Sequence, residues 1–341
     1  MFWLRPDLDR AALGAAGWLD TAIFDIDGVL LDTSGSFRRS VIAATEALVR
    51  VANGLADAPD PLVTFDDVAR FKLAGGFNDD WNLTQALAAL WTARLREWRG
   101  APQAERSLSE WAEDATAATR AGRGGLDWLR GVVPASAIPA WEDARWTHDE
   151  FYLGAAMLRE AFGRAPRYTP AAPGVRQTER SLLAPETLTE LAALSLSKYG
   201  IITGRDSPYV EWALEVIAPE GAVARTGPYG PHGPHARPPF GVIVPGSLYA
   251  KPDPEALAHA LAVLEARAAV YVGDTADDLD LVLRYRAERL AQAPDLPPTL
   301  AVSVASEPAA ETFRQRGADI ILTRVSELPA ALVALRQRLG G

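Results

Sequence analysis

One stretch decides the fold of this chain: residues 21–33, with the sequence TAIFDIDGVLLDT. An apolar run at residues 22–24 lacks polar alternation, which is typical of a strand buried on both faces of a parallel sheet. The run ends at Asp25 and Asp27. Because side chains of an extended segment repeat every second residue, both carboxylates can point into one crevice. Two carboxylates in a small space repel each other unless a cation or a shared proton neutralises them, so the pair indicates a site. The alternative is a pair of solvated loop carboxylates.

Size and composition set broad limits. The chain has 341 residues, enough for about two domains. Hydrophobic residues make up 48% and charged residues 23%, which provides for a sizeable core and excludes global disorder. The 34 basic and 44 acidic residues give a formal charge of -10, which disfavours nucleic acid and anionic membranes as partners. The absence of cysteine excludes disulfides, thiolate catalysis and cysteine-based metal sites.

The hydropathy pattern predicts a cytoplasmic location. The first 20 residues are interrupted by Arg5, Asp7, Asp9 and Arg10, so they lack the apolar core of a signal peptide. Nowhere does an apolar run approach membrane-spanning length. We therefore expect a soluble cytoplasmic protein.

Helical and strand patterns divide the chain into two regions. Residues 34–195 carry helical apolar periodicity and no convincing strand. Within them, Ser107 and Glu110 form a predicted capping box, and Thr147 and Glu150 repeat that signature. Beyond residue 196, strand-like apolar runs alternate with helical patterns. The strand-like runs lie at residues 199–202, 241–244, 268–272, 300–304 and 319–322.

Repeated strand–helix units predict an α/β fold, a Rossmann-like parallel sheet with helices on both faces. We assign residues 1–33 and 196–341 to this catalytic core domain and residues 34–195 to an inserted all-helical cap domain. Because the insertion directly follows the first strand, it should emerge beside the carboxyl ends of the strands, where such sheets bind ligands. The Pro- and Gly-rich stretch at residues 221–239 has no assigned role. Its pair of histidines, His232 and His235, lacks a nearby third metal ligand.

Polar residues follow several of the predicted strands. Asp25, Thr203 and Asp274 each come just after a strand, so we expect them to meet at one edge of the sheet. Asp278 lies one helical turn beyond Asp274. Lys251, one of only three lysines in the chain, precedes a predicted helix. Carboxylate oxygens are ligands that suit Mg²⁺ and not zinc.

This set of side chains permits phosphoryl transfer. With Mg²⁺ relieving the repulsion, one carboxylate is free to attack phosphorus and form an aspartyl-phosphate. A second carboxylate can protonate the leaving alcohol and later activate water. Thr203 can donate its hydroxyl and a backbone N–H to phosphate oxygens, Gly204 lets the backbone approach, and Lys251 offsets the crowded anions. Each residue singly also suits a structural role such as a helix cap, and only their joint placement after the predicted strands indicates a site.

The chain resembles the haloacid dehalogenase superfamily of phosphohydrolases. Four segments carry the resemblance, in the family's order: residues 25–29 (DIDGV), 201–204 (IITG), 251–252 (KP) and 273–278 (GDTADD). The resemblance covers residues 20–33 and about 185–325. The insertion between the first two segments is similar to the family's helical-cap class, in a branch with a long cap.

The resemblance implies a role for each matching residue. Asp25 is then the nucleophile and Asp27 the acid/base. Mg²⁺ is then held by Asp25, the Asp27 carbonyl and Asp274, with Asp278 in support. Asp27 also argues against removal of halide, because the family's dehalogenases lack an acid/base aspartate there.

These inferences predict a Mg²⁺-dependent phosphatase that hydrolyses a small phosphorylated metabolite through an aspartyl-phosphate. A sugar-phosphate mutase on the same core is an alternative, and so is a non-catalytic phosphate-sensing module. Candidates for substrate specificity lie beside a Gly-Gly turn or near the sheet edge: Lys72, Asn78, Asp79, Trp81, Arg38, Arg39 and Arg205. Alternatively, Trp81 belongs to the core of the cap, Asp79 caps a helix, and the arginines are solvated.

Overall fold

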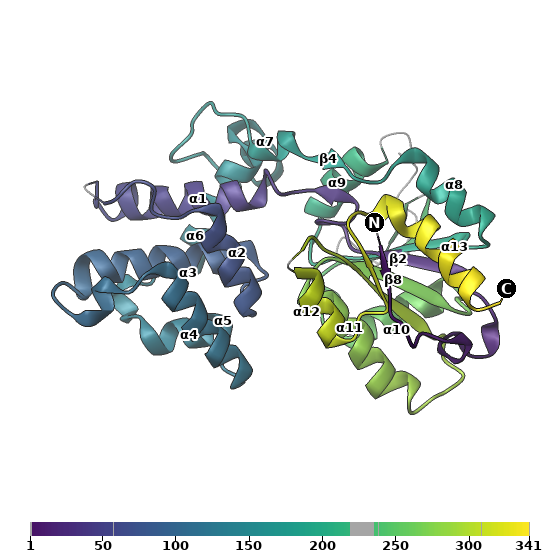
Figure 1. Ribbon diagram of the computed structural model, residues 1–341. Helices are drawn as coiled ribbons and strands as arrows, with labels where there is room; N and C mark the ends of the chain where they lie inside the picture. Colours follow the sequence, from purple (N-terminus) through teal and green to yellow (C-terminus); the bar gives the residue numbers. More distant parts are fainter. Residues whose placement is uncertain (1, 57, 219–234, 238, 308, 341) are drawn as a thin grey trace. The chain divides into compact units, whose positions relative to one another are not determined.

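The computed structural model describes residues 2–56, 58–218, 235–237, 239–307 and 309–340. The chain divides into two compact units, one formed by residues 1–32 and 180–341 and the other by residues 33–179. The first unit contains a large sheet, and the second is helical (Figure 1). No helix in the described ranges is long and apolar enough to cross a membrane.

A mostly parallel sheet organises the first unit. Its described strands run in the order β1-β10-β9-β8-β2-β5-β7-β6. They are β1 (Trp3–Leu4), β2 (Thr21–Phe24), β5 (Lys198–Ile202), β6 (His235–Arg237), β7 (Phe240–Val244), β8 (Ala269–Gly273), β9 (Thr299–Val304) and β10 (Ile320–Leu322). The inner strands from β10 to β7 pair in parallel, whereas β1 and β6 pair antiparallel at the two ends of this order.

Helices cover both faces of the sheet, as the unbroken apolar strands predicted. In β2, Ala22 and Phe24 belong to one core cluster, whereas Ile23 belongs to the other, because successive side chains of a strand point to opposite faces. The first face packs against α8 (Pro185–Ala193), α9 (Tyr209–Ile217) and α13 (Leu328–Arg338). The second face packs against α10 (Pro254–Val263), α11 (Ala276–Arg284) and α12 (Ala309–Arg316). The predicted α/β fold class is therefore confirmed.

The second unit has its own hydrophobic core. Its main helices are α1 (Phe37–Ala47), α2 (Phe65–Ala74), α3 (Asp80–Thr92), α4 (Leu108–Arg120), α5 (Gly125–Val132), α6 (Trp141–Leu153) and α7 (Ala155–Phe162). Phe71, Phe77 and Trp128 pack ring against ring in this core, at centroid distances of 5.7–6.2 Å. A separate core is what allows this segment to form a domain inserted into another fold.

The second boundary between the units lies between residues 179 and 180, whereas the sequence predicted it after residue 195. Residues 180–195 belong to the unit that contains the sheet. Strand β4 (Arg180–Ser181) pairs antiparallel with β3 (Leu31–Asp32), and Leu191 of α8 is buried in the core of the sheet. A two-residue strand such as β4 has too little periodicity to be recognised in a sequence.

One predicted capping box is confirmed and the other is wrong. Ser107 accepts the Glu110 backbone N–H at the start of α4, and the Glu110 carboxylate accepts the Ser107 backbone N–H at 2.7 Å. Thr147 and Glu150 lie instead inside α6, and both are buried. The Glu150 carboxylate accepts backbone N–H groups of residues 167–169, so it supports a folded loop and not a helix start.

The stretch at residues 221–239 falls largely outside the described residues, and so does His232. Of this stretch, only residue 239 and strand β6, which begins at His235, are described.

Candidate active site

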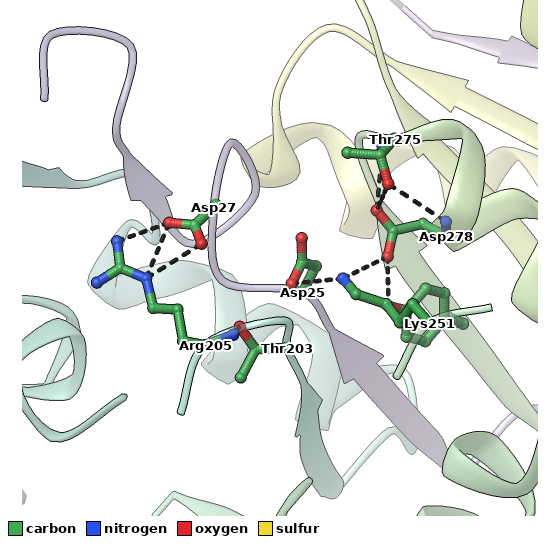
Figure 2. Close-up of polar contacts among 8 residues, drawn as sticks. Asp25, Asp27, Thr203, Arg205, Lys251, Thr275 and Asp278 are labelled. Atoms are coloured by element: carbon green, nitrogen blue, oxygen red, sulfur yellow. Dashed lines mark hydrogen bonds and ion pairs between the residues drawn. The ribbon is translucent and has the colours of Figure 1, made fainter. Parts of the chain in front are cut away.

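The candidate site lies at the carboxyl ends of four neighbouring strands. Asp25 follows β2, Thr203 follows β5 and Asp274 follows β8, while Lys251 lies between β7 and α10. These strands are adjacent in the order β8-β2-β5-β7, so residues distant in sequence meet at one edge (Figure 2). After β2, the chain adds β5 and β7 on one side of β2 and then β8, β9 and β10 on the other side. Such a reversal of strand order leaves a crevice in which ligands bind.

A tight turn after β2 places the first carboxylates. The backbone N–H of Asp25 donates to the Val272 carbonyl of β8 at 2.8 Å, which extends the pairing of β2 with β8 by one residue. The chain then folds back, and the backbone N–H groups of residues 29–31 point to the Ile26 carbonyl. Gly28 has φ +75°, and a Cβ added there would lie 2.1 Å from Oδ2 of Asp274. Glycine is therefore required both by the turn and by the approach of the Asp274 carboxylate.

Three carboxylates gather at this edge. Asp25, Asp274 and Asp278 each offer an oxygen, and the three oxygens lie within 4.8 Å of one another. Oδ1 of Asp274 is buried without a hydrogen-bond partner. Burial, and then the charges of Asp25 and Asp278, raise the pKa of Asp274 well above its ordinary value. A buried carboxylate oxygen with no donor is costly, and an all-oxygen cluster fits a hard cation such as Mg²⁺.

Asp278 differs from Asp274, because both of its oxygens have protein donors. Lys251 and the Tyr271 hydroxyl donate to Oδ1 at 2.7 and 2.6 Å, and the Thr275 hydroxyl donates to Oδ2 at 2.6 Å. Although burial opposes ionisation, the ion pair with Lys251 and these hydrogen bonds keep the pKa of Asp278 below its ordinary value. Asp278 is thus a charged anchor that fixes Lys251 and the start of α11.

Lys251 joins Asp278 to Asp25. Its ammonium lies 2.9 Å from Oδ1 of Asp25 and 2.7 Å from Oδ1 of Asp278. Burial disfavours the charge, but the two carboxylates outweigh burial and raise the pKa of Lys251. Burial raises the pKa of Asp25 to about 7, with Lys251 opposing and the neighbouring carboxylates Asp278 and Asp27 adding to the rise. Lys251 is therefore cationic, while Asp25 is a carboxylate whose charge the site only partly compensates.

Thr203 and Arg205 stand on the turn after β5. Thr203 is fully buried, and its backbone N–H donates to the Val244 carbonyl at the end of β7 at 3.0 Å. Its hydroxyl accepts the Arg205 backbone N–H at 3.2 Å. A Cβ on Gly204 would meet no atom within 4 Å, so the backbone there is open to close approach.

Arg205 is buried, and its guanidinium contacts Asp27. Nε lies 3.1 Å from both carboxylate oxygens of Asp27, and Nη2 lies 2.7 Å from Oδ1. Only 6% of Arg205 is exposed. Arg205 therefore lies against Asp27 and not on a solvated surface.

Comparison with known proteins identifies the family. The sequence matches the family model of haloacid dehalogenase-like hydrolases over residues 19–281. The chain belongs to this family. The family match spans the candidate site, from the strand before Asp25 to helix α11.

Solved structures share the fold at low sequence identity. A phosphatase, Tt82, from Thermococcus thioreducens is 22% identical and superposes with a TM-score of 0.54, covering 87% of this chain and 99% of its own. A structural genomics target, ZR25, is 16% identical with a TM-score of 0.51, covering 93% of this chain and 99% of its own. None of the curated proteins matches this chain.

The remaining predicted residues of this hydrolase lie in the helical unit. Lys72 pairs with Asp80 at 3.0 Å, and Asp79 caps α3 by accepting the Asn82 backbone N–H at 2.7 Å. Asn78 is exposed just ahead of that cap.

Trp81 lies in an aromatic cluster of the same unit. Its indole N–H donates to Oδ1 of Asp149 at 2.9 Å, and the guanidinium of Arg145 lies 4.7 Å from its ring centroid. Arg38 is half-buried on α1, and Arg39 beside it is exposed. Asp79 thus has the role of a helix cap, whereas Trp81 is half-buried against Trp141 and Arg145 and does not belong to the hydrophobic core of this unit.

Two residues that complete the candidate site were missed from the sequence. Thr275 forms a capping box with Asp278, a signature visible in the order Thr-x-x-Asp. Tyr271 lies within the apolar run of β8, where nothing in the sequence distinguishes it from a core residue. Its hydroxyl bond to Asp278 is apparent only in the folded chain.

Proposed function

We propose that this haloacid dehalogenase-like hydrolase is a Mg²⁺-dependent phosphatase that hydrolyses a small phosphorylated metabolite through an aspartyl-phosphate on Asp25. The support is the position of the Asp25 carboxylate. It is buried at the sheet edge, lies 2.9 Å from the Lys251 ammonium and shares a cluster with the unpaired oxygen of Asp274. A partly compensated carboxylate in a charged crevice is suited to attack on an electrophile.

The proposed metal ligands are Asp25, the backbone carbonyl of Asp27 and Asp274, with Asp278 in support. The cluster of oxygens and the lack of a donor for Asp274 fit a divalent cation. When bound, Mg²⁺ would neutralise the carboxylates and polarise a phosphate oxygen. Asp278 would support the metal site indirectly. Its oxygens already accept hydrogen bonds from Lys251, Tyr271 and Thr275, so its role would be to hold Lys251 in place.

The chemistry then divides between two aspartates. The Asp25 carboxylate forms a bond to phosphorus as the bond to the leaving oxygen breaks, and Asp27 gives that oxygen a proton. In the second step Asp27 takes a proton from water, and the water oxygen displaces Asp25 from phosphorus. Inorganic phosphate leaves and Asp25 is restored. Thr203, Gly204 and Lys251 would bind the phosphate oxygens through hydroxyl, backbone N–H and ammonium donors.

We further propose that the helical unit is a cap that selects the leaving group. Lys72, Asn78, Asp79 and Trp81, which surround the turn into α3, are the candidates for this contact, together with Arg38. Closure of a cap excludes water and strengthens charge interactions inside the site. A cytoplasmic location remains a prediction from the sequence.

Phosphate release provides the test. The purified protein is incubated with Mg²⁺, p-nitrophenyl phosphate and a panel of metabolite phosphates, and free phosphate is measured. Asp25→Asn should remove turnover. Asp319→Asn is the matched control, because Asp319 is a buried, paired aspartate of the same unit outside the site. Turnover without free phosphate would indicate a mutase, tight binding without turnover would indicate a sensing module, and activity equal to that of Asp25→Asn would refute the proposal.

A further inference from the structure

The two aspartates of the first segment have different cationic partners. Asp25 pairs with Lys251, whereas Asp27 turns toward Arg205 (Figure 2). The second pair is two-pronged, with Nε and Nη2 of Arg205 both facing the carboxylate of Asp27 at 2.7–3.1 Å. Such a fork fixes the plane of a carboxylate as well as its position, which a single ammonium does not.

Arg205 is itself held from several sides. Its backbone N–H donates to the Thr203 hydroxyl at 3.2 Å, its carbonyl accepts the Gly246 N–H at 3.2 Å, and Nη1 donates to the Tyr209 carbonyl at 3.3 Å. The guanidinium side chain is 4% exposed, whereas the Asp27 side chain is 31% exposed. The arginine is therefore the more enclosed partner, and the aspartate keeps part of its side chain exposed.

We propose that Arg205 is a positioning residue, which orients the Asp27 carboxyl group for proton transfer to the leaving oxygen. This inference rests on the proposed phosphatase function. In the step concerned, the O–H bond of Asp27 breaks as the leaving oxygen takes the proton, and that oxygen keeps the electron pair of the broken P–O bond. The inference replaces the expectation that Arg205 contributes to substrate specificity, because its side chain donates to Asp27 and to the Tyr209 carbonyl.

Dependence on the leaving group distinguishes positioning from mere structural support. Protonation accelerates departure of an alcohol of high pKa far more than departure of p-nitrophenolate, which leaves readily as an anion. The value of kcat/KM reports on steps up to phosphoryl transfer and is not affected by the later hydrolysis of the intermediate. Ethyl, phenyl and p-nitrophenyl phosphate carry no second anion, so a lost substrate contact cannot imitate the effect.

The experiment measures kcat/KM for these three esters with the Mg²⁺-loaded full chain. For Arg205→Met we expect a loss of about 10- to 100-fold on ethyl phosphate and of less than about 3-fold on p-nitrophenyl phosphate, since general acid catalysis contributes about 100-fold or more. Arg205→Lys keeps the charge without the fork, so its loss on ethyl phosphate should be smaller but in the same direction. Arg286→Met is the control, because Arg286 also pairs with a buried aspartate, Asp319, outside the site.

A double-mutant cycle completes the test. In the Asp27→Asn background, Arg205→Met should cause no further loss on ethyl phosphate, because the group that it orients is gone. Equal losses on all three esters, or fully additive losses in the cycle, would overturn the positioning role while leaving the phosphatase proposal standing. Failure of the unaltered protein to hydrolyse any ester would instead refute both.

Discussion

Replacing Asp25 with asparagine should stabilise the metal-free protein at alkaline pH, although it removes the proposed nucleophile. In the folded chain the pKa of Asp25 rises from an ordinary 3.8 to about 7, chiefly because of burial. At about 1.4 kcal/mol for each pH unit, the ionised carboxylate opposes folding by about 4 kcal/mol above pH 7. The attraction of Lys251 is already contained in that pKa, so losing the ion pair does not reverse the sign.

The pH dependence follows from linkage. The folded state holds the Asp25 proton more tightly than the unfolded state, so stability falls as pH rises from about 4 to about 7. Asparagine carries no such charge. The advantage of Asp25→Asn in unfolding free energy should therefore be about 1–2 kcal/mol at pH 5 and about 4 kcal/mol at pH 8, provided that metal is removed with EDTA.

Denaturant unfolding at the two pH values measures this difference. Added Mg²⁺ should then stabilise the unaltered protein more than Asp25→Asn, because the variant lacks one proposed ligand. Asp20→Asn is a control of opposite sign. Hydrogen bonds from Arg267 and Lys198 outweigh burial and lower the pKa of Asp20, so this variant should lose stability at pH 8. If Asp25→Asn is no more stable than the unaltered protein at pH 8 in EDTA, the charge of Asp25 is fully compensated in the folded chain, which contradicts this account.

Three further predictions concern neighbouring residues. Lys251→Met should lower kcat/KM by about 100-fold or more and reduce stability at neutral pH, because it leaves Asp25 and Asp278 without their shared cation. Steady-state kinetics measures the first effect and thermal unfolding the second. Gly28→Ala should cost about 1–3 kcal/mol and abolish stabilisation by Mg²⁺, because its Cβ meets the Asp274 carboxylate, and a thermal-shift titration with Mg²⁺ follows this. Asp79→Ala should cost about 1 kcal/mol through loss of the α3 cap, and an additional rise in KM for the true substrate would reveal contact with the leaving group.

Sequence patterns predict the architecture because they reflect burial. The apolar run at residues 22–24 lies in a strand buried on both faces, and its neighbours β5 and β8 show the same pattern. The chain order of strands and helices then leads to a parallel sheet, with polar residues after the strands on one edge. Short elements cannot be predicted from such patterns. Strand β1 consists of two residues, and its pairing with β10 depends on a partner more than 300 residues away.

Side-chain partners are less predictable than strand ends. The spacing of Asp25 and Asp27 suggests one crevice for both, yet the folded chain pairs them with different cations. The direction of Arg205 depends on the turn after β5, which sequence spacing does not describe. Glu150 shows that a Thr-x-x-Glu spacing need not mark a helix start. It lies inside α6, and its carboxylate accepts backbone N–H groups of a loop.

Trapping of the covalent intermediate tests the central claim most directly. The protein is mixed with Mg²⁺ and a substrate identified in the phosphate-release panel, quenched in acid within one turnover and digested for peptide mass spectrometry. We predict one added phosphoryl group on the peptide that contains Asp25, absent from Asp25→Asn. With p-nitrophenyl phosphate, whose leaving group needs little protonation, the phosphorylated peptide should be more abundant in Asp27→Asn, because hydrolysis is then the slowed step. Undiminished phosphate release by Asp25→Asn, or a phosphoryl group on another residue, would contradict the account.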